Sequence, residues 1–234
     1  MKIIQFSGGK DSVVCLHMYR NDPDVVALYI DTGNAFEHVR KYVKETCEKY
    51  KVKLYVRGPD RPVDQWQDEY GLPSDVVPWD STPMMRDMVK KNFTNKIIPY
   101  STCCTVNIWA PLMNGVLELG AKTVIRGSKS CDEKVGVKDG YVDENGISFM
   151  SPLWDWTHED VFAYIEEHDI VLPKHYTKDN DSLDCWSCTA YMGPHGKERL
   201  AYLKKEYPDI YPKALERFNR VKSTVKEAVE YFYS

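Results

Sequence analysis

A short apolar segment near the start of the chain runs directly into a glycine-rich string, and this limits the folds that the sequence can adopt. Residues Lys2 to Phe6 have the composition of a buried strand, and Ser7-Gly8-Gly9-Lys10-Asp11-Ser12 follows at once. From Ser12 to Arg20, apolar residues recur over a helical length. The order of strand, tight loop and helix predicts the opening unit of an α/β protein.

The alternation of strands and helices continues after this unit. Val25 to Ile30 predicts a second strand, Phe36 to Tyr50 a helix, and Val52 to Val56 a third strand. Strands that alternate with helices form a parallel sheet with helices on both faces. We therefore predict the α/β class, with a doubly wound parallel sheet and a helical C-terminal extension.

The pattern is interrupted by prolines between Arg57 and Tyr100, where we expect a long covering segment with short helices. Beyond it, regular elements return. They are a helix from Val106 to Leu119, a strand from Lys122 to Ile125, a hairpin from Tyr141 to Met150, a helix capped by Thr157 and running to about His168, and two closing helices from Lys197 to Glu206 and from Tyr211 to Phe232.

Composition excludes several classes of protein. A formal net charge of -4 argues against extensive coating of nucleic acid, although the basic C-terminal region leaves nucleic acid open as a partner. No apolar run approaches the roughly 18 residues of a membrane span, and the N-terminus lacks the order of a secretory signal. We therefore expect a cytoplasmic protein that does not associate with membranes. The oligomeric state is left open.

The string from Ser7 to Ser12 predicts a phosphate-binding loop. Backbone amides of a glycine-rich turn and of the helix that follows form a nest for an anion, and Lys10 adds a positive charge. The Walker pattern is absent, so we do not predict a P-loop phosphotransferase. Ligands of open parallel sheets lie at the carboxyl ends of strands, so Asp31, Thr32 and Gly33 are expected to flank the nucleoside or its phosphates.

Four of the seven cysteines are spaced like the ligands of a metal site. Cys103 and Cys104 are adjacent, and Cys185 and Cys188 are separated by Trp186 and Ser187. Four thiolates suit an iron–sulfur cluster or zinc, and adjacent cysteines reach two iron atoms more readily than two vertices of one zinc tetrahedron. A cluster is the preferred interpretation, with zinc and with disulfides or free thiols as the alternatives.

Three segments resemble the phosphoadenosine phosphosulfate (PAPS) reductase family of PP-loop, adenine nucleotide α-hydrolase-like proteins. They are Ser7 to Ser12, Asp31-Thr32-Gly33 with Phe36-Glu37, and Ser151-Pro152-Leu153-Trp154-Asp155-Trp156-Thr157 with Asp160-Val161. The resemblance implies adenylyl-nucleotide binding and a role in sulfur metabolism. It also implies a nucleotide-binding domain over residues 1–192 that carries the cluster, with a helical extension over residues 193–234 packed on the same domain.

The resemblance assigns further site residues. Arg126-Gly127-Ser128-Lys129-Ser130 matches the basic substrate loop of the family, and Lys134 would join Arg126 and Lys129 in holding an anionic substrate. The four spaced cysteines are similar to those that bind a [4Fe–4S] cluster in the family's adenylylsulfate reductases. Where those enzymes carry a basic pair after the double cysteine, this chain has Asn107-Ile108.

The chain departs from the reductases at its C-terminal end. They attack sulfur with a cysteine in a C-terminal segment, whereas no cysteine follows Cys188 here. Cys131 is the other candidate nucleophile, in the predicted substrate loop, while Cys15 and Cys47 are expected to be buried structural residues. Lys10 and Asp11 resemble the ATP-pyrophosphatase branch, in which Lys10 would stabilise phosphate charge, Mg²⁺ would share that role, and Asp11 is a candidate metal partner.

Three functions follow from these observations. The preferred one is an iron–sulfur enzyme that binds ATP or an adenylyl nucleotide and takes part in sulfur transfer or substrate adenylylation, with a sulfur or electron donor protein as a partner. The second is a reductase of adenylyl sulfate or phosphoadenylyl sulfate that uses Cys131 or an external thiol. The third is a non-catalytic protein that binds nucleotide or senses redox state.

Overall fold

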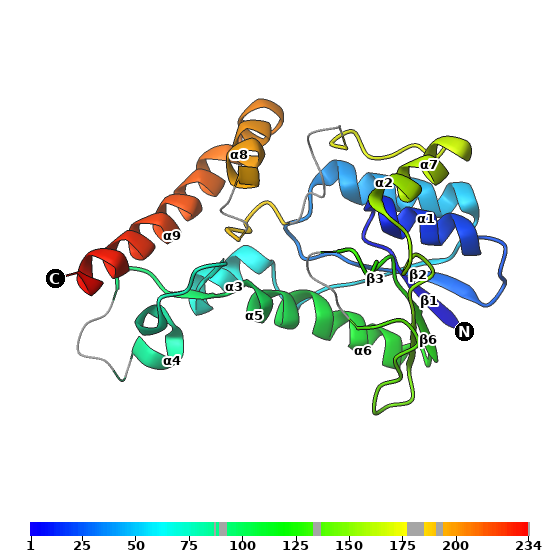
Figure 1. Ribbon diagram of the computed structural model, residues 1–234, viewed down its shortest axis with the longest axis horizontal. Helices are drawn as coiled ribbons and strands as arrows, with labels where there is room; N and C mark the ends of the chain where they lie inside the picture. Colours follow the sequence, from blue (N-terminus) through cyan, green and yellow to red (C-terminus); the bar gives the residue numbers. More distant parts are fainter. Residues whose placement is uncertain (87, 89–92, 133–136, 177–184, 191–193, 234) are drawn as a thin grey trace. The chain divides into compact units, whose positions relative to one another are not determined.

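The computed structural model describes residues 1–86, 88, 93–132, 137–176, 185–190 and 194–233 (Figure 1). The chain forms two compact units, which are described separately. The first contains Met1–Asp31, Phe36–Gly58 and Ala110–Ser182, and the second contains Thr32–Ala35, Pro59–Trp109 and Leu183–Ser234. The predicted boundary between residues 192 and 193 stays a prediction.

In the described part of the first unit, five strands form a parallel sheet in the order β3-β2-β1-β6-β7. Ile3 pairs with Val26 on one side and with Val124 on the other, so β1 lies in the centre of the sheet. Its strands are β1 (Lys2–Gln5), β2 (Val25–Ile30), β3 (Leu54–Arg57), β6 (Thr123–Ile125) and β7 (Ser148–Met150).

Helices cover both faces of this sheet, which confirms the doubly wound α/β class. Figure 1 shows α1 (Lys10–Tyr19) and α2 (Glu37–Tyr50) on one side of the strands and α6 (Ala110–Glu118) on the other. Leu112 and Val116 of α6 are buried against sheet residues that include Leu28. Because the chain builds β2 and β3 on one side of β1 and β6 on the other, the strand order reverses beside β1.

The helix α7 (His158–Glu167) of the first unit begins where its sequence predicts. The Thr157 hydroxyl accepts a hydrogen bond from the Asp160 amide, and the Asp160 carboxylate accepts one from the Thr157 amide. This reciprocal capping box satisfies two amides that the helix cannot pair internally. The predicted hairpin before α7 is present as a turn with one antiparallel bridge, between Val142 and Ser148, while β7 itself pairs in parallel with β6.

The second unit contains a small sheet that the sequence analysis did not predict. Between residues 57 and 100 we expected a long covering segment with short helices, but β4 and β5 pair in parallel there. Leu72 and Ile97 from these strands are buried with Val221 of the long C-terminal helix. The elements are α3 (Val63–Tyr70), β4 (Leu72–Ser74), η1 (Trp79–Ser81), α4 (Pro83–Arg86), β5 (Ile97–Pro99), α5 (Tyr100–Cys104), the π-helical turn η2 (Thr105–Trp109), α8 (Pro194–Glu206) and α9 (Tyr211–Phe232).

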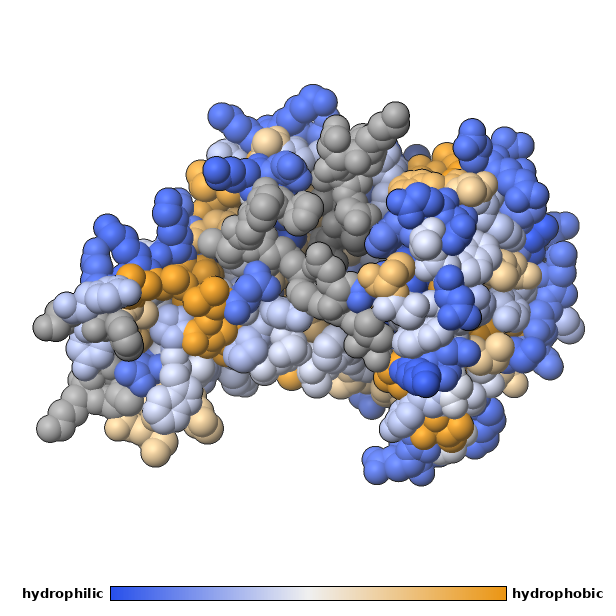
Figure 2. All heavy atoms as spheres, viewed as in Figure 1, coloured by the Kyte–Doolittle hydropathy of each residue, from blue (hydrophilic) through white to orange (hydrophobic). Residues whose placement is uncertain are grey.

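The surface is mainly hydrophilic on the face drawn in Figure 2, with smaller hydrophobic patches between the polar side chains. Among the described residues, no helix is long and apolar enough to cross a membrane.

Candidate functional site

A cavity of about 310 Å³ lies at the carboxyl ends of β1 and β6. The loop from Ser7 to Gly9 follows β1, and the loop from Arg126 to Ser128 follows β6. Because the strand order reverses between these two strands, they form the topological switch point at which open α/β sheets bind their ligands. The described residues that line the cavity are Gln5, Ser7, Gly9, Lys10, Asp11, Ser12, Arg126, Gly127, Ser128, Asp132, His158 and Tyr176.

The loop after β1 has the backbone geometry of a tight strand-to-helix turn. Gly8 adopts a φ of +83°, and a Cβ atom at this position would lie 2.9 Å from Val43 Cγ2, so glycine is required. The Ser12 hydroxyl donates to the Gly9 carbonyl oxygen over 2.9 Å. Gly9 has no side chain that could cap α1, and the Lys10 amide instead donates to the hydroxyl of Tyr176 over 3.1 Å. The N-terminal end of α1 therefore lies at the cavity with the Tyr176 hydroxyl on its first amide.

Buried charges link this loop to the loop after β6. Lys129 Nζ lies 2.7 Å from Asp11 Oδ1 and 2.9 Å from Asp132 Oδ1, and its side chain is only 1% exposed. Burial disfavours its charge, but the bonds from the two carboxylates outweigh burial and raise the pKa of Lys129. Lys10 Nζ contacts the other oxygen of Asp11 over 3.2 Å. Lys129 is not among the described residues that line the cavity, and it ties the two loops together.

Arg126 differs from these lysines because it forms no ion pair with any residue that the structure describes. Its side chain lines the cavity, and burial lowers the pKa of its guanidinium. A partly desolvated cation is stabilised by an anion that can accept its hydrogen bonds. The cavity is therefore suited to a phosphate or sulfate group.

Gly127 allows the two loops to approach closely, and we predict that alanine at this position disrupts the cavity. A Cβ atom there would lie 2.8 Å from both the carbonyl carbon and the Cβ of Asp11. Overpacking against backbone typically costs about 1–3 kcal/mol. Gly127→Ala should lower the free energy of unfolding by this amount and weaken nucleotide binding, as measured by chemical denaturation and titration calorimetry.

Gly120→Ala is the control for this prediction. Gly120 has a φ of +63° and no atom within 4 Å of an added Cβ, so alanine should cost about 1–2 kcal/mol of stability through its backbone alone. Nucleotide affinity should then stay unchanged. Equal affinities in Gly127→Ala and the unsubstituted protein would contradict the role assigned to Gly127.

The segment after β2 is not among the described residues that line the cavity. Asp31 Oδ2 pairs with Arg40 Nε over 2.9 Å in the first unit. Thr32 and Gly33 belong to the second unit, where Thr32 Oγ1 lies 3.1 Å from Cys185 Sγ. Their expected contacts with the nucleoside stay predictions.

The four spaced cysteines all lie in the second unit. Cys103 and Cys104 end α5, while Cys185 and Cys188 share a turn in which the Cys188 amide donates to the Cys185 carbonyl oxygen over 3.0 Å. Burial raises the pKa of Cys103 to about 11, and Cys188 contributes to the shift, so these two sulfurs interact. As a free thiol, Cys103 is therefore protonated and unreactive.

Two side-chain amides lie beside the sulfur of Cys103, and neither contact was predicted from sequence. The side-chain amides of Gln67 and Asn107 donate to its sulfur over 3.4 and 3.8 Å. Gln67 is held in turn by the buried guanidinium of Arg217, which donates to its Oε1 over 2.8 Å. Asn107 follows Cys103 by one helical turn, a spacing that is visible in sequence. Arg217 lies 150 positions from Gln67, so no local pattern indicates the contact.

The other cysteines occupy different environments. Cys15 and Cys47 are buried, as predicted, and burial raises the pKa of each thiol to about 12. Cys131 is exposed, in the loop after β6, and its sulfur lies 3.3 Å from the Trp156 carbonyl oxygen. Lys134, expected to bind substrate, lies outside the described residues.

Known proteins share both sequence and fold with this chain. An uncharacterized protein of Methanocaldococcus jannaschii is 25% identical over 223 residues, 92% of this chain and 47% of that protein. Phosphoadenosine 5'-phosphosulfate reductase of Vibrio parahaemolyticus is 25% identical over 171 residues, 72% of this chain and 58% of that enzyme. The chain thus spans about half the length of the curated relatives it matches.

A solved structure and a family model agree with these relatives. The crystal structure of phosphoadenylyl-sulfate (PAPS) reductase from Candida auris, in complex with phosphate, superposes with a TM-score of 0.54 at 20% identity and covers 79% of this chain and 81% of that one. The phosphoadenosine phosphosulfate reductase domain model matches residues 2–191, so the chain belongs to this family.

Proposed function

We propose that this protein is an adenine-nucleotide-dependent enzyme of sulfur metabolism that cleaves ATP with release of pyrophosphate to activate its substrate. The observation that carries the proposal is Arg126, a half-buried cation without an ion-pair partner among the described residues, in a cavity at the switch point of the sheet. Membership of the PAPS reductase domain family supports an adenylyl nucleotide as the ligand.

The residues that line the cavity would bind different parts of the nucleotide and its metal ion. The amides of Gly9 and Lys10 would cradle phosphate by exchanging their bonds to Ser7 Oγ and the Tyr176 hydroxyl for bonds to the ligand. The hydroxyls of Ser7 and Ser12 lie beside them, and Arg126 would offset the phosphate charge. Mg²⁺ in such sites is usually held by one or two carboxylates plus substrate phosphates. Asp11 would serve as that carboxylate only by loosening its contact with Lys10 or Lys129.

We include a [4Fe–4S] cluster on Cys103, Cys104, Cys185 and Cys188 in the proposal. The two amide donors directed at Cys103 suit a sulfur that carries negative charge, as a thiolate ligand does. Without a metal, burial keeps this thiol protonated. The cluster would require reduced thiols, which is consistent with the cytoplasmic location that we propose.

Arg217 provides a test of the environment of this cluster. The Arg217 guanidinium binds the side chain of Gln67, which in turn donates to the sulfur of Cys103, so a positive charge lies close to that sulfur. The chain has no basic pair after its double cysteine that could supply such a charge. Positive charge and hydrogen bonds to sulfur raise the reduction potential of a cluster. Arg217→Gln should therefore make the potential more negative in an electrochemical titration.

Arg57→Gln is the matched control for this substitution because Arg57 pairs with Glu118 in the first unit. It should leave the potential of the cluster unchanged. If folded Arg217→Gln has the same reduction potential as the unsubstituted protein, Arg217 does not influence the cluster.

The proposed activity is tested by assays on the full chain purified without oxygen. With ATP and candidate sulfur or amine acceptors, the proposal predicts pyrophosphate release. A reductase is the second candidate, favoured by the exposed Cys131 in the loop that supplies Arg126 to the cavity. It predicts thiol-dependent release of sulfite from adenylyl sulfate or phosphoadenylyl sulfate. If nucleotides bind but neither product forms, the chain is a binding or sensing protein and the enzymatic proposal is wrong.

A further inference from the structure

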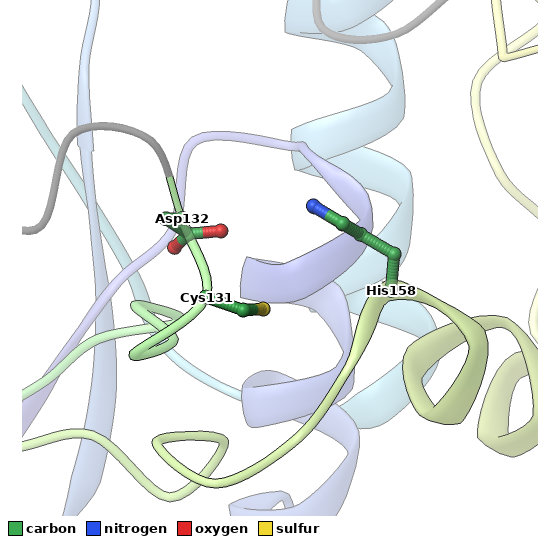
Figure 3. A group of neighbouring side chains, drawn as sticks. All are labelled: Cys131, Asp132 and His158. Atoms are coloured by element: carbon green, nitrogen blue, oxygen red, sulfur yellow. The ribbon is translucent and has the colours of Figure 1, made fainter.

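Three side chains with different ligand atoms converge beside the phosphate cavity. Cys131 and Asp132 come from the loop after β6, and His158 is the first residue of α7. A sulfur, a carboxylate oxygen and a ring nitrogen from these residues all lie within 4.8 Å of one another. Figure 3 shows them approaching from two separate segments of the first unit.

The donor set indicates which ion this arrangement can hold. Mg²⁺ and Ca²⁺ prefer oxygen ligands, whereas sulfur and imidazole nitrogen select transition metals such as Zn²⁺. Three protein ligands with one position left open are typical of zinc sites that act on a bound molecule. The cluster of Cys131, Asp132 and His158 therefore suits zinc better than it suits the magnesium expected with ATP.

Hydrogen bonds from Lys129 and Ser130 fix the position of the loop that carries Cys131 and Asp132. Asp132 Oδ2 accepts a hydrogen bond from the Lys129 amide over 2.9 Å, and its Oδ1 binds Lys129 Nζ at the same distance. The Ser130 amide donates to the Trp154 carbonyl oxygen over 2.8 Å. The two backbone bonds orient Asp132 and its loop, as hydrogen bonds to metal ligands do, whereas a metal ion on Asp132 Oδ1 would compete with the Lys129 ammonium.

We propose that Cys131, Asp132 and His158 bind one divalent transition metal ion, with Zn²⁺ as the simplest case. Asp132 and His158 line the phosphate cavity, so an ion bound to them would lie at the wall of the space that a nucleotide or its anionic substrate would enter. Water or an oxygen of that ligand would complete the coordination. A Cys131 sulfur held by zinc is no longer a free nucleophile, which weighs against the reductase alternative.

Alkylation of individual cysteines tests the proposal without relying on activity. Cys131 is exposed and should react with iodoacetamide in the metal-free full chain, which peptide mass spectrometry resolves from the other cysteines. Added Zn²⁺ should slow this reaction. In His158→Asn, the zinc concentration that gives half-maximal protection should rise at least about 10-fold.

Glu159→Gln is the control, since Glu159 is an exposed neighbour of His158 outside the three-residue cluster. It should keep full protection. If Zn²⁺ does not slow the alkylation of Cys131 in the unsubstituted protein, the proposal is overturned. It is also overturned if Zn²⁺ protects Cys131 equally well in His158→Asn. A second readout is Co²⁺, whose thiolate charge-transfer absorption should lose one cysteine's contribution in Cys131→Ser.

Discussion

Replacing Arg126 with alanine should weaken the binding of ATP and of adenylyl sulfate about 10- to 100-fold. Hydrogen bonds to a charged group contribute about 1.5–3 kcal/mol, and 1.4 kcal/mol corresponds to a factor of 10 in affinity. Arg126 already lines the cavity, and burial lowers the pKa of its guanidinium. Alanine removes a desolvated cation without breaking an ion pair to any described residue, so the fold should survive. Titration calorimetry with each nucleotide measures the change.

Arg57→Ala is the matched control for Arg126→Ala. Arg57 ends β3 and pairs with the exposed Glu118 over 2.9 Å. An exposed pair of this kind contributes at most about 1 kcal/mol, and its loss should leave nucleotide affinity unchanged. If both variants lose the same nucleotide affinity, the effect comes from the change in net charge and not from the position of Arg126. If Arg126→Ala keeps its affinity, Arg126 does not belong to the phosphate site.

Replacing Cys188 with serine should remove most of the iron and acid-labile sulfide from protein prepared without oxygen. Burial raises the pKa of Cys103, with a smaller contribution from Cys188, and both would be ligands of the proposed cluster. A serine hydroxyl is a poor replacement because iron–sulfur clusters are held by thiolates. Chemical analysis of iron and sulfide per chain measures the loss, and the visible absorption of the cluster should fall with it.

Cys131→Ser is the control for this experiment because Cys131 is an exposed cysteine of the first unit. It should retain the iron and sulfide content of the unsubstituted protein. Stoichiometric zinc without sulfide, retained in Cys131→Ser and lost in Cys188→Ser, would identify the four cysteines as a zinc site and contradict the cluster.

The elements that depend on local patterns could be predicted from sequence. Val25 to Ile30 and Tyr211 to Phe232 have the predicted bounds, because each is a continuous apolar or periodic segment. Thr157 caps α7 as expected, since a capping box involves residues three positions apart. The parallel sheet was predicted because strands alternate with helices along the chain.

Contacts between distant segments could not be predicted. The strands β4 and β5 have three residues each and contain Pro73 and Pro99, which normally argue against a strand. Lys129 was expected to face substrate, yet it binds Asp11, which lies 118 positions away. The sequence indicates a basic residue in the loop but not which carboxylate it meets. The same limitation applies to Arg217 and Gln67.

The most direct test of the account is competition between ligands for the cavity at the ends of β1 and β6. Titration calorimetry on the full chain should show that ATP binds, that pyrophosphate alone also binds and displaces it, and that adenosine binds much more weakly. This order is expected because the Ser7 to Ser12 loop and Arg126 are suited to phosphate. Adenosine that binds as tightly as ATP, with no displacement by pyrophosphate, would contradict the assignment of this cavity as a phosphate site.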